Sequence, residues 1–203
     1  MSADNPSPYT AEQALRRLKE GNERFVNGEA RFPTIQKEVL VELTRGQQPY
    51  ATILGCSDSR VPPELVFDAG FGELFVVRVA GNVLGPSILG TLQYAANHLH
   101  TPLFVIMGHE GCGAVKAAIA WKLEGARHAS KIEVLLENIL PALDGVDPAQ
   151  APEAFMQSAV EANVRHAVSA LRTPEVQERL AVSGMKLVGA VYDLESGRVR
   201  FLE

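Results

Sequence analysis

The chain has 203 residues, of which 46% are hydrophobic and 21% are charged, and its formal net charge at pH 7 is −5. This composition is ordinary for a globular protein, and the length suffices for one domain with a substantial core. No run of Lys and Arg suggests a surface for nucleic acid or anionic membrane, and no segment approaches the roughly 20 apolar residues needed to cross a bilayer. We therefore expect a single domain over residues 1–203 that binds neither nucleic acid nor membrane.

The first ten residues, MSADNPSPYT, lack the basic start and the apolar segment of a secretory signal peptide. A cytoplasmic location is therefore expected, unless a leader has already been removed. The chain has two cysteines, Cys56 and Cys112. In a cytoplasmic protein, such a pair favours a metal or catalytic site over a disulfide.

A helix is predicted to begin after Thr10, because Gln13, three residues later, completes a capping box. One face of this helix contains three apolar residues and one polar residue: Leu15, Leu18, Asn22 and Phe25. Gly28 is expected to end the helix. Residues 1–30 thus form an N-terminal helical arm.

Strands and helices are predicted to alternate through the middle of the chain. A second helix is expected over residues 35–45. Three apolar segments of strand length then end in small or polar residues: 50–55, 73–81 and 101–109. A helical segment over residues 86–99 separates the last two. This alternation is typical of a parallel sheet with right-handed crossovers.

The C-terminal half is predicted to be helical before it ends in a hairpin. Helices are expected from Gly113 onward and over three further segments: 130–140, 152–171 and 174–182. The tail, MKLVGAVYDLESGRVRFLE, reads as two strands joined by a Ser-Gly turn. The predicted fold class is therefore α/β, with a mostly parallel sheet flanked by helices, an N-terminal helical arm and a C-terminal hairpin.

Potential metal ligands follow two of the predicted strands. Cys56 comes directly after the first strand, and GHEGCGAV at the end of the third contains His109 and Cys112. Functional groups collect beyond the carboxyl ends of parallel strands, and a Cys, Cys and His set suits Zn²⁺ with a fourth position open. A lone cysteine after a strand is more often a buried apolar residue, so the spacing alone leaves both interpretations open.

Asp58 and Arg60 lie in the same segment, TILGCSDSRVPPE. Taken alone, such a pair is more often a structural ion pair than a catalytic one. Both cysteines, the histidine and this pair nevertheless fall at the ends of only two strands. That coincidence favours a functional site.

These motifs resemble the β-class carbonic anhydrase family. CSDSR, with HEGC 53 positions after its cysteine, VPPELVFDAGFGELFVVRVAGN and LGTLQYAANHLHTPLFVIMGHEGCGAV all match the family pattern. The resemblance covers residues 10–122 closely and the tail loosely. It implies a lyase that interconverts CO₂ and bicarbonate by attack of zinc-bound hydroxide, with one Zn²⁺ per subunit. It also implies a homodimer or homotetramer in which the arm over residues 1–30 packs on a partner subunit.

By this resemblance, Asp58 and Arg60 form a catalytic dyad beside the zinc ligands Cys56, His109 and Cys112. Asp58 could otherwise occupy the open metal position, and the planar guanidinium of Arg60 can hold it away by a bidentate contact. Two thiolates reduce the charge on the metal, so a bound-water pKa in the upper part of the range of roughly 7–9 is expected. Activity should then rise at mildly alkaline pH.

The resemblance also implies a substrate pocket. Gln47 matches an amide that binds substrate, and the Gly113 N–H group matches a nearby backbone donor. Phe75 and Ala80 match apolar lining, and Tyr94 matches an aromatic residue that reaches a neighbouring subunit's site. Pattern alone would assign Phe75 and Tyr94 to the core.

One position departs from a subgroup of the family that binds inhibitory bicarbonate at a second site formed by Trp, Arg and Tyr. The Arg and Tyr correspond to Arg78 and Tyr192, but the Trp position is Ile53. The chain therefore resembles the subgroup whose resting site is open.

Three other functions remain possible on sequence grounds. A hydrolase of carbon disulfide or carbonyl sulfide would share the fold and zinc ligands, but those relatives depart from CSDSR, which is intact here. A non-catalytic protein that binds zinc or bicarbonate would hold the metal without turnover. Thiol redox chemistry would need a disulfide between Cys56 and Cys112.

Overall fold

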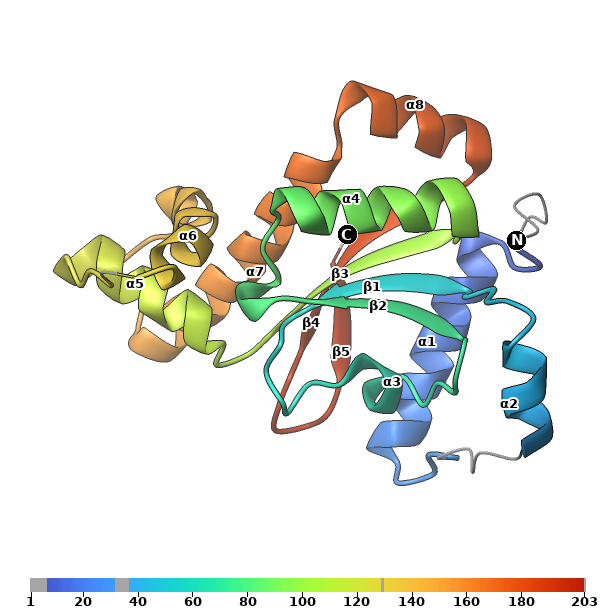
Figure 1. Ribbon diagram of the computed structural model, residues 1–203. Helices are drawn as coiled ribbons and strands as arrows, with labels where there is room; N and C mark the ends of the chain where they lie inside the picture. Colours follow the sequence, from blue (N-terminus) through green and yellow to red (C-terminus); the bar gives the residue numbers. More distant parts are fainter. Residues whose placement is uncertain (1–6, 32–36, 129, 203) are drawn as a thin grey trace.

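The computed structural model describes residues 7–31, 37–128 and 130–202, and its centre is a five-stranded sheet (Figure 1). The strand order is β2-β1-β3-β4-β5. The strands are β1 (Ala51–Gly55), β2 (Leu74–Arg78), β3 (Leu103–His109), β4 (Lys186–Tyr192) and β5 (Val199–Leu202). The first four in spatial order are parallel, and β5 is antiparallel to β4. The predicted mostly parallel sheet and the C-terminal hairpin are confirmed.

Helices cover the sheet. The α-helices are α1 (Ala11–Val26), α2 (Lys37–Leu43), α3 (Pro63–Val66), α4 (Pro86–Tyr94), α5 (Gly113–Glu124), α6 (Ile132–Glu137), α7 (Pro152–Leu171) and α8 (Pro174–Ser183). Two short 3₁₀ segments cover Ala80–Asn82 and Leu140–Gly145, and a π-helical turn over Ala95–Leu99 continues α4. No helix of the described residues is long and apolar enough to cross a membrane.

The core lies around the two central strands. Every residue of β1 and β3 is buried, as expected for continuous apolar runs in a parallel sheet covered on both faces. Helix α7 packs on β3 and β4, while α1 packs on α3 and β3. The α7 contact is close, because a Cβ atom at Gly108 would lie 2.6 Å from a methyl group of Val164. Glycine at this strand position therefore allows α7 to approach the sheet.

The predicted start of α1 is confirmed. Thr10 accepts a hydrogen bond from the Gln13 backbone, and the Gln13 side chain accepts one from Thr10 in return. Leu18 on the apolar face is fully buried within the chain itself. Packing of the arm on a partner subunit remains a prediction.

Several elements differ from the sequence-based expectation; β2 ends at Arg78 rather than at residue 81, and α6 covers only Ile132–Glu137 of the range 130–140. The one-turn helix α3 was not predicted, because a four-residue helix that begins with proline reads as a loop. Helix α2 occupies only Lys37–Leu43 of the range 35–45, and residues 35 and 36 lie outside the described part of the chain. The helix predicted over 86–99 changes to a π-helical turn after Tyr94 and ends at His100, whose φ is 49°.

Candidate metal centre

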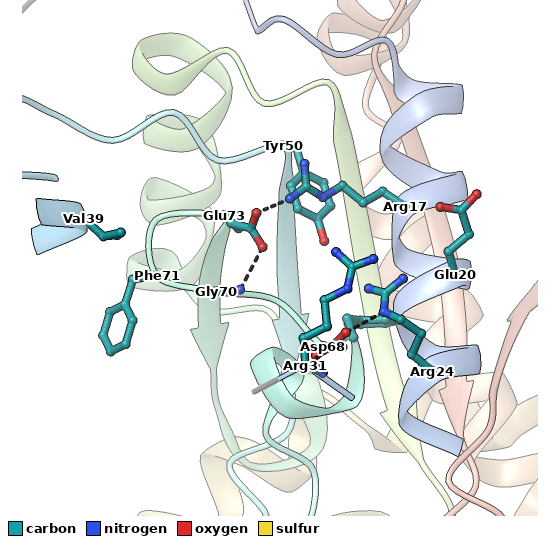
Figure 2. A pocket seen from close by; sticks show the side chains of 11 residues that line it. Arg17, Glu20, Arg24, Arg31, Val39, Tyr50, Asp68, Gly70, Phe71 and Glu73 are labelled. Atoms are coloured by element: carbon teal, nitrogen blue, oxygen red, sulfur yellow. Dashed lines mark hydrogen bonds and ion pairs between the residues drawn. The ribbon is translucent and has the colours of Figure 1, made fainter. Parts of the chain in front are cut away.

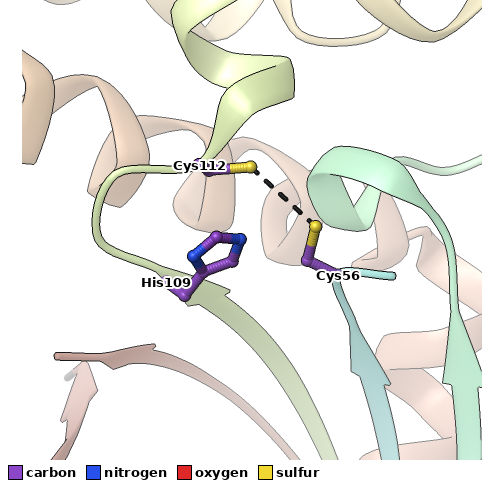
Figure 3. A group of neighbouring side chains, drawn as sticks. All are labelled: Cys56, His109 and Cys112. Carbon is purple, nitrogen blue, oxygen red and sulfur yellow. Dashed lines mark hydrogen bonds between the residues drawn. The ribbon is translucent and has the colours of Figure 1, made fainter. Parts of the chain in front are cut away.

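Cys56, His109 and Cys112 meet at the carboxyl edge of the sheet (Figure 3). Cys56 directly follows β1, His109 is the last residue of β3, and Cys112 immediately precedes α5. Because β1 and β3 are adjacent and parallel, their carboxyl ends bring these side chains together. The two Sγ atoms lie 3.9 Å apart, and the three potential ligand atoms all lie within 4.8 Å of one another. None of the three residues is more than 4% exposed.

The imidazole of His109 is oriented to bind a metal. Its Nδ1 atom lies 2.9 Å from the Glu110 carbonyl oxygen, which makes Nδ1 the donor nitrogen. Its Nε2 atom is buried and has no hydrogen-bond partner within the described part of the chain. An orphaned buried nitrogen beside two thiols fits a metal ligand, and this kind of carbonyl contact commonly fixes the tautomer of metal-binding histidines.

The two thiols also fit a divalent cation. The Cys112 thiol stabilises a thiolate at Cys56 by hydrogen bonding, which lowers the pKa of Cys56 and, together with burial, raises the pKa of Cys112. The backbone N–H of Gly81 also donates to Cys56 Sγ, at 3.4 Å. Two thiolates in this space require a positive charge, and two sulfur ligands of a tetrahedral zinc ion would lie about 3.8 Å apart. The Sγ–Sγ distance is therefore suitable for zinc.

Asp58 and Arg60 form the predicted ion pair at the rim of this cluster. Arg60 donates from Nε to Asp58 Oδ1 at 2.9 Å and from Nη2 to Oδ2 at 2.7 Å. Hydrogen bonds from Arg60 hold the pKa of Asp58 well below its usual range, so the carboxylate is ionised at neutral pH. Asp58 Oδ2 is also 3.8 Å from His109 Nε2. The carboxylate is thus close to the candidate metal ligands while its oxygens contact Arg60.

Three residues behind the cluster were not predicted to support it. Arg78 donates to the Cys56 carbonyl at 2.9 Å and to the Asp58 carbonyl at 2.5 Å. The buried amide of Asn163 in α7 donates to the Gly81 carbonyl at 2.9 Å. Gly81 has a φ of 70°, and a Cβ atom there would lie 2.8 Å from Ile139. The motif RVAGN contains Arg78 and Gly81, but no local pattern identifies their partners.

The predicted substrate-pocket residues divide between the two edges of the sheet. Ala80, after β2, and Gly113, at the start of α5, lie at the metal edge. Gln47 precedes β1, Phe75 lies near the start of β2, and Tyr94 ends α4, which leads from the end of β2 back toward the start of β3, so these three lie toward the opposite edge. The rings of Phe75 and Tyr94 are 6.2 Å apart, and Tyr94 is 43% exposed. The structure therefore does not bring these three residues to the metal ligands of their own chain.

The three positions that correspond to the second bicarbonate site lie in different surroundings. Ile53 is fully buried in the middle of β1, and Tyr192 is buried beside His109 at the end of β4. The guanidinium of Arg78 contacts two backbone carbonyl groups instead. The absence of that second site remains a prediction from Ile53.

A separate cavity of about 520 Å³ lies between α1 and the loop that precedes β2 (Figure 2). Arg17 pairs there with Glu73, and Arg24 pairs with Asp68 at 2.6 Å. Its charged lining residues are Arg17, Glu20, Arg24, Arg31, Asp68 and Glu73. Equal numbers of positive and negative groups give no preference for an anion or a metal cation, so we assign this cavity no part in the chemistry.

Comparison with known proteins identifies the family. The sequence model of the carbonic anhydrase family matches residues 51–199. The chain is 39% identical over 196 residues to "Carbonic anhydrase 2" of Mycobacterium tuberculosis, covering 96% of this chain and 92% of that protein. It is 36% identical over 195 residues to the carbonic anhydrase of Mycolicibacterium smegmatis, with 96% and 93% covered.

Solved structures show the same relationship. The β-carbonic anhydrase CafA of Aspergillus fumigatus matches with a TM-score of 0.74 and 27% identity, covering 95% of this chain and 90% of that one. A tetrameric β-carbonic anhydrase from Sordaria macrospora shares the fold at a TM-score of 0.75 and 22% identity, with 93% and 96% covered. The chain therefore belongs to the β-class carbonic anhydrase family.

Proposed function

We propose that this protein catalyses the reversible hydration of CO₂ to bicarbonate and a proton, with one Zn²⁺ per subunit held by Cys56, His109 and Cys112. The observation that carries the proposal is the buried convergence of two thiols and an unpartnered imidazole nitrogen beside the Asp58–Arg60 pair. Three protein ligands leave the fourth tetrahedral position open, which is typical of a catalytic rather than a structural zinc site.

When bound, zinc would supply a nucleophile at near-neutral pH by lowering the pKa of a coordinated water from 15.7 toward roughly 7. Asp58 Oδ2 would accept a hydrogen bond from the attacking oxygen and orient its lone pair toward CO₂. Arg60 would keep Asp58 available for this role by occupying both carboxylate oxygens. The Gly113 N–H group and the Ala80 side chain would contact the uncharged substrate.

The resting site is proposed to be open, with the fourth metal position available to water. The bidentate contact of Asp58 with Arg60 supports this arrangement, because both carboxylate oxygens already have a cationic partner. Ile53 at the Trp position supports the absence of the inhibitory bicarbonate site. Both cysteines are free and buried, which is consistent with the proposed cytoplasmic location.

A homodimer would complete the site. We propose that it forms through β2, the outermost strand of the sheet, along the side of this strand that faces away from β1. Among the strands of the described residues, β2 pairs only with β1, so its other side can receive a second strand. If two copies of β2 pair antiparallel about a two-fold axis, the start of each strand lies beside the end of the other. Gln47, Phe75 and Tyr94 of one subunit would then approach the metal ligands of its partner.

Several exposed apolar side chains around the start of β2 support the same interface, and they come from α2, α3 and the loop before β2. They are Val39, Leu40, Val41, Leu65 and Phe71. Phe71 is the most exposed of these five side chains, at 61%. A dimer or a tetramer built on this interface would agree with the tetrameric relative from Sordaria macrospora. The N-terminal arm is proposed to add contacts to the partner.

The proposal is tested by measuring zinc content and stopped-flow CO₂ hydration on the same preparations. The unaltered protein should contain one zinc per chain and hydrate CO₂, and Cys56→Ala, His109→Ala and Cys112→Ala should each lose both properties. His128→Ala, which changes a histidine outside the site, is the control. A zinc-replete, active Cys112→Ala protein would overturn the proposal. Release of sulfide from carbon disulfide without CO₂ hydration would instead favour the hydrolase, and full zinc without either activity would favour a binding protein.

A further inference from the structure

Arg78 makes an unusual pair of contacts at the end of β2. Its Nε atom donates to the carbonyl oxygen of Cys56 at 2.9 Å, and its Nη2 atom donates to that of Asp58 at 2.5 Å. Cys56 provides a proposed metal ligand, and Asp58 provides the proposed catalytic carboxylate. One guanidinium therefore binds the backbone of both functional residues, on either side of Ser57.

The segment after β1 needs such support. Ser57, Ser59 and Arg60 are exposed, and Asp58 is only partly buried. The Asp58 carbonyl also accepts a hydrogen bond from the Val61 N–H group, at 3.2 Å, which closes a short turn. This turn is local, so it cannot by itself determine where Asp58 lies relative to the sheet and to Cys56.

The backbone at Arg78 is held in place by the sheet. Arg78 is paired with Gly55 in the parallel register of β1 and β2. The next residue, Val79, donates its N–H group to the Gly55 carbonyl at 3.1 Å. The backbone at Arg78 is thus paired with the end of β1, the residue before Cys56. Its side chain transmits the position of that strand to the exposed segment beyond it.

We propose that Arg78 is a positioning residue: it clamps the carbonyl groups of Cys56 and Asp58 and so sets the distance between the metal ligand and the catalytic carboxylate. It acts through Asp58 and does not touch substrate. Its catalytic consequence rests on the proposed function, whereas its effect on the segment at residues 56–61 does not. This role differs from anion binding, because the contacts of the guanidinium are with neutral backbone carbonyl groups.

The contact geometry favours arginine over lysine at this position. A guanidinium presents several N–H donors in a rigid plane, so it can bind two carbonyl oxygens with fixed separation. A lysine ammonium is a single point on a flexible stem and retains the charge without the fixed pair of directions. Arg78→Lys therefore keeps the positive charge but removes the two fixed donor directions, so it tests the clamp apart from the charge.

The first test uses metal-free protein and needs no activity. Hydrogen–deuterium exchange of the peptide spanning residues 56–62 should be roughly tenfold faster in Arg78→Ala, because local opening of a freed segment dominates its exchange. Arg78→Lys should lie between this variant and the unaltered protein. Arg127→Ala is the control, since Arg127 is an exposed arginine paired with Glu133 away from the site. Unchanged exchange at residues 56–62, or an equal increase throughout the sheet, would overturn the clamp.

The second test uses zinc-loaded protein and a double-mutant cycle. Arg78→Ala should retain zinc and lower kcat by roughly 10- to 100-fold, as loss of an outer-shell partner does at metal sites, with a smaller effect on KM. Arg78→Lys should recover only part of the loss. Asp58→Asn should abolish the effect of Arg78→Ala, because a clamp that acts through Asp58 has nothing to position once that carboxylate is removed.

Multiplicative losses in the double variant would show that Arg78 acts independently of Asp58 and would overturn the proposal. Full activity of Arg78→Ala would also overturn it. If the unaltered protein failed to hydrate CO₂, the proposed function would fail, while the exchange experiment on metal-free protein would still decide whether Arg78 holds the segment.

Discussion

At the residue scale, the charges around the site explain why Arg60 accompanies Asp58. With the proposed zinc ion bound, two thiolates and one carboxylate would carry three negative charges, and the divalent cation would offset only two of them. Arg60 would supply the remaining positive charge through the two hydrogen bonds that its guanidinium donates to Asp58. The carboxylate could then lie beside the proposed metal ligands without having to coordinate the metal.

This arrangement predicts different behaviour for two variants that both lose activity. Arg60→Ala should let Asp58 compete for the open metal position, so small anions should bind weakly. Asp58→Ala should leave that position open, so the same anions should bind readily. Turnover should fall by roughly 10- to 100-fold in each variant with zinc retained, in keeping with losses of outer-shell groups.

An anion titration of cobalt-substituted protein, followed by its visible spectrum, measures this difference. The unaltered protein is the reference, and Arg127→Ala controls for the loss of an exposed arginine. Equal anion affinity in Arg60→Ala and Asp58→Ala would mean that Arg60 does not hold Asp58 away from the metal. The pair would then be an ordinary structural ion bridge.

At the scale of single elements, helix α1 is held to the sheet by a polar residue. Asn22 lies on the buried face of the helix and is 5% exposed. Its amide donates to the carbonyls of Val66 at 3.1 Å and Gly197 at 2.8 Å, and its carbonyl accepts from the Val199 N–H group at 2.9 Å. The polar interruption in the apolar face therefore joins α1 to α3 and to the start of β5.

Asn22→Ala should lower the free energy of unfolding by roughly 1–3 kcal/mol, because it leaves buried backbone groups without hydrogen-bond partners. Alanine has the higher helix propensity, so any loss must come from these contacts rather than from the helix itself. Urea denaturation measures the change. Arg16→Ala, an exposed position of the same helix, is the control and should change stability by no more than about 0.5 kcal/mol. An equal effect of both substitutions would contradict the assigned role.

A second contact between elements predicts a pH dependence. Glu161 of α7 accepts hydrogen bonds from Arg200 of β5 and from Arg165, and these lower the pKa of Glu161. Because the folded-state pKa is below the unfolded value of about 4.3, the stabilisation is complete above that pH and is lost as the pH falls. Glu161→Gln should therefore make the unfolding free energy less dependent on pH below about 5, by at most about 1 kcal/mol. Parallel pH profiles for the two proteins would contradict this.

At the scale of the whole molecule, a single chain separates the residues that the proposed pocket requires. In a parallel sheet all carboxyl ends lie at one edge, so Cys56 and His109 meet there. Gln47 precedes β1 and Phe75 is near the start of β2, so both lie toward the other edge. If Gln47 and Phe75 belong to the proposed pocket, a second copy of the chain must bring them to the proposed metal site.

A hybrid dimer tests this arrangement. Cys112→Ala should disable the metal site of its own chain, and Gln47→Ala should impair the site of the partner. A heterodimer of the two variants, isolated with two different tags, contains one unaltered site and should show about half the activity of the unaltered dimer. Each variant homodimer is the control and should be far less active. A heterodimer no more active than the homodimers would mean that Gln47 does not act across the interface.

Much of this organisation was determined by the sequence itself. The capping box at Thr10, the apolar strands and the C-terminal hairpin depend on neighbouring residues, so local patterns were sufficient to predict them. The placement of Cys56, His109 and Cys112 after strands also predicted their convergence, because parallel strands share an edge. The helix α3 and the π-helical turn after Tyr94 were missed, since they depend on the packing around them.

Only the tertiary structure decided which distant groups pair. Asn22 bonds to Gly197, 175 residues away, and Arg78 bonds to Cys56 and Asp58 in the segment that follows the neighbouring strand β1. The separation of Gln47 from the metal edge likewise follows from strand direction and order. Hydrogen-bond partners of this kind are set by how the elements pack, and the periodicity of a short segment carries no information about what lies across from it.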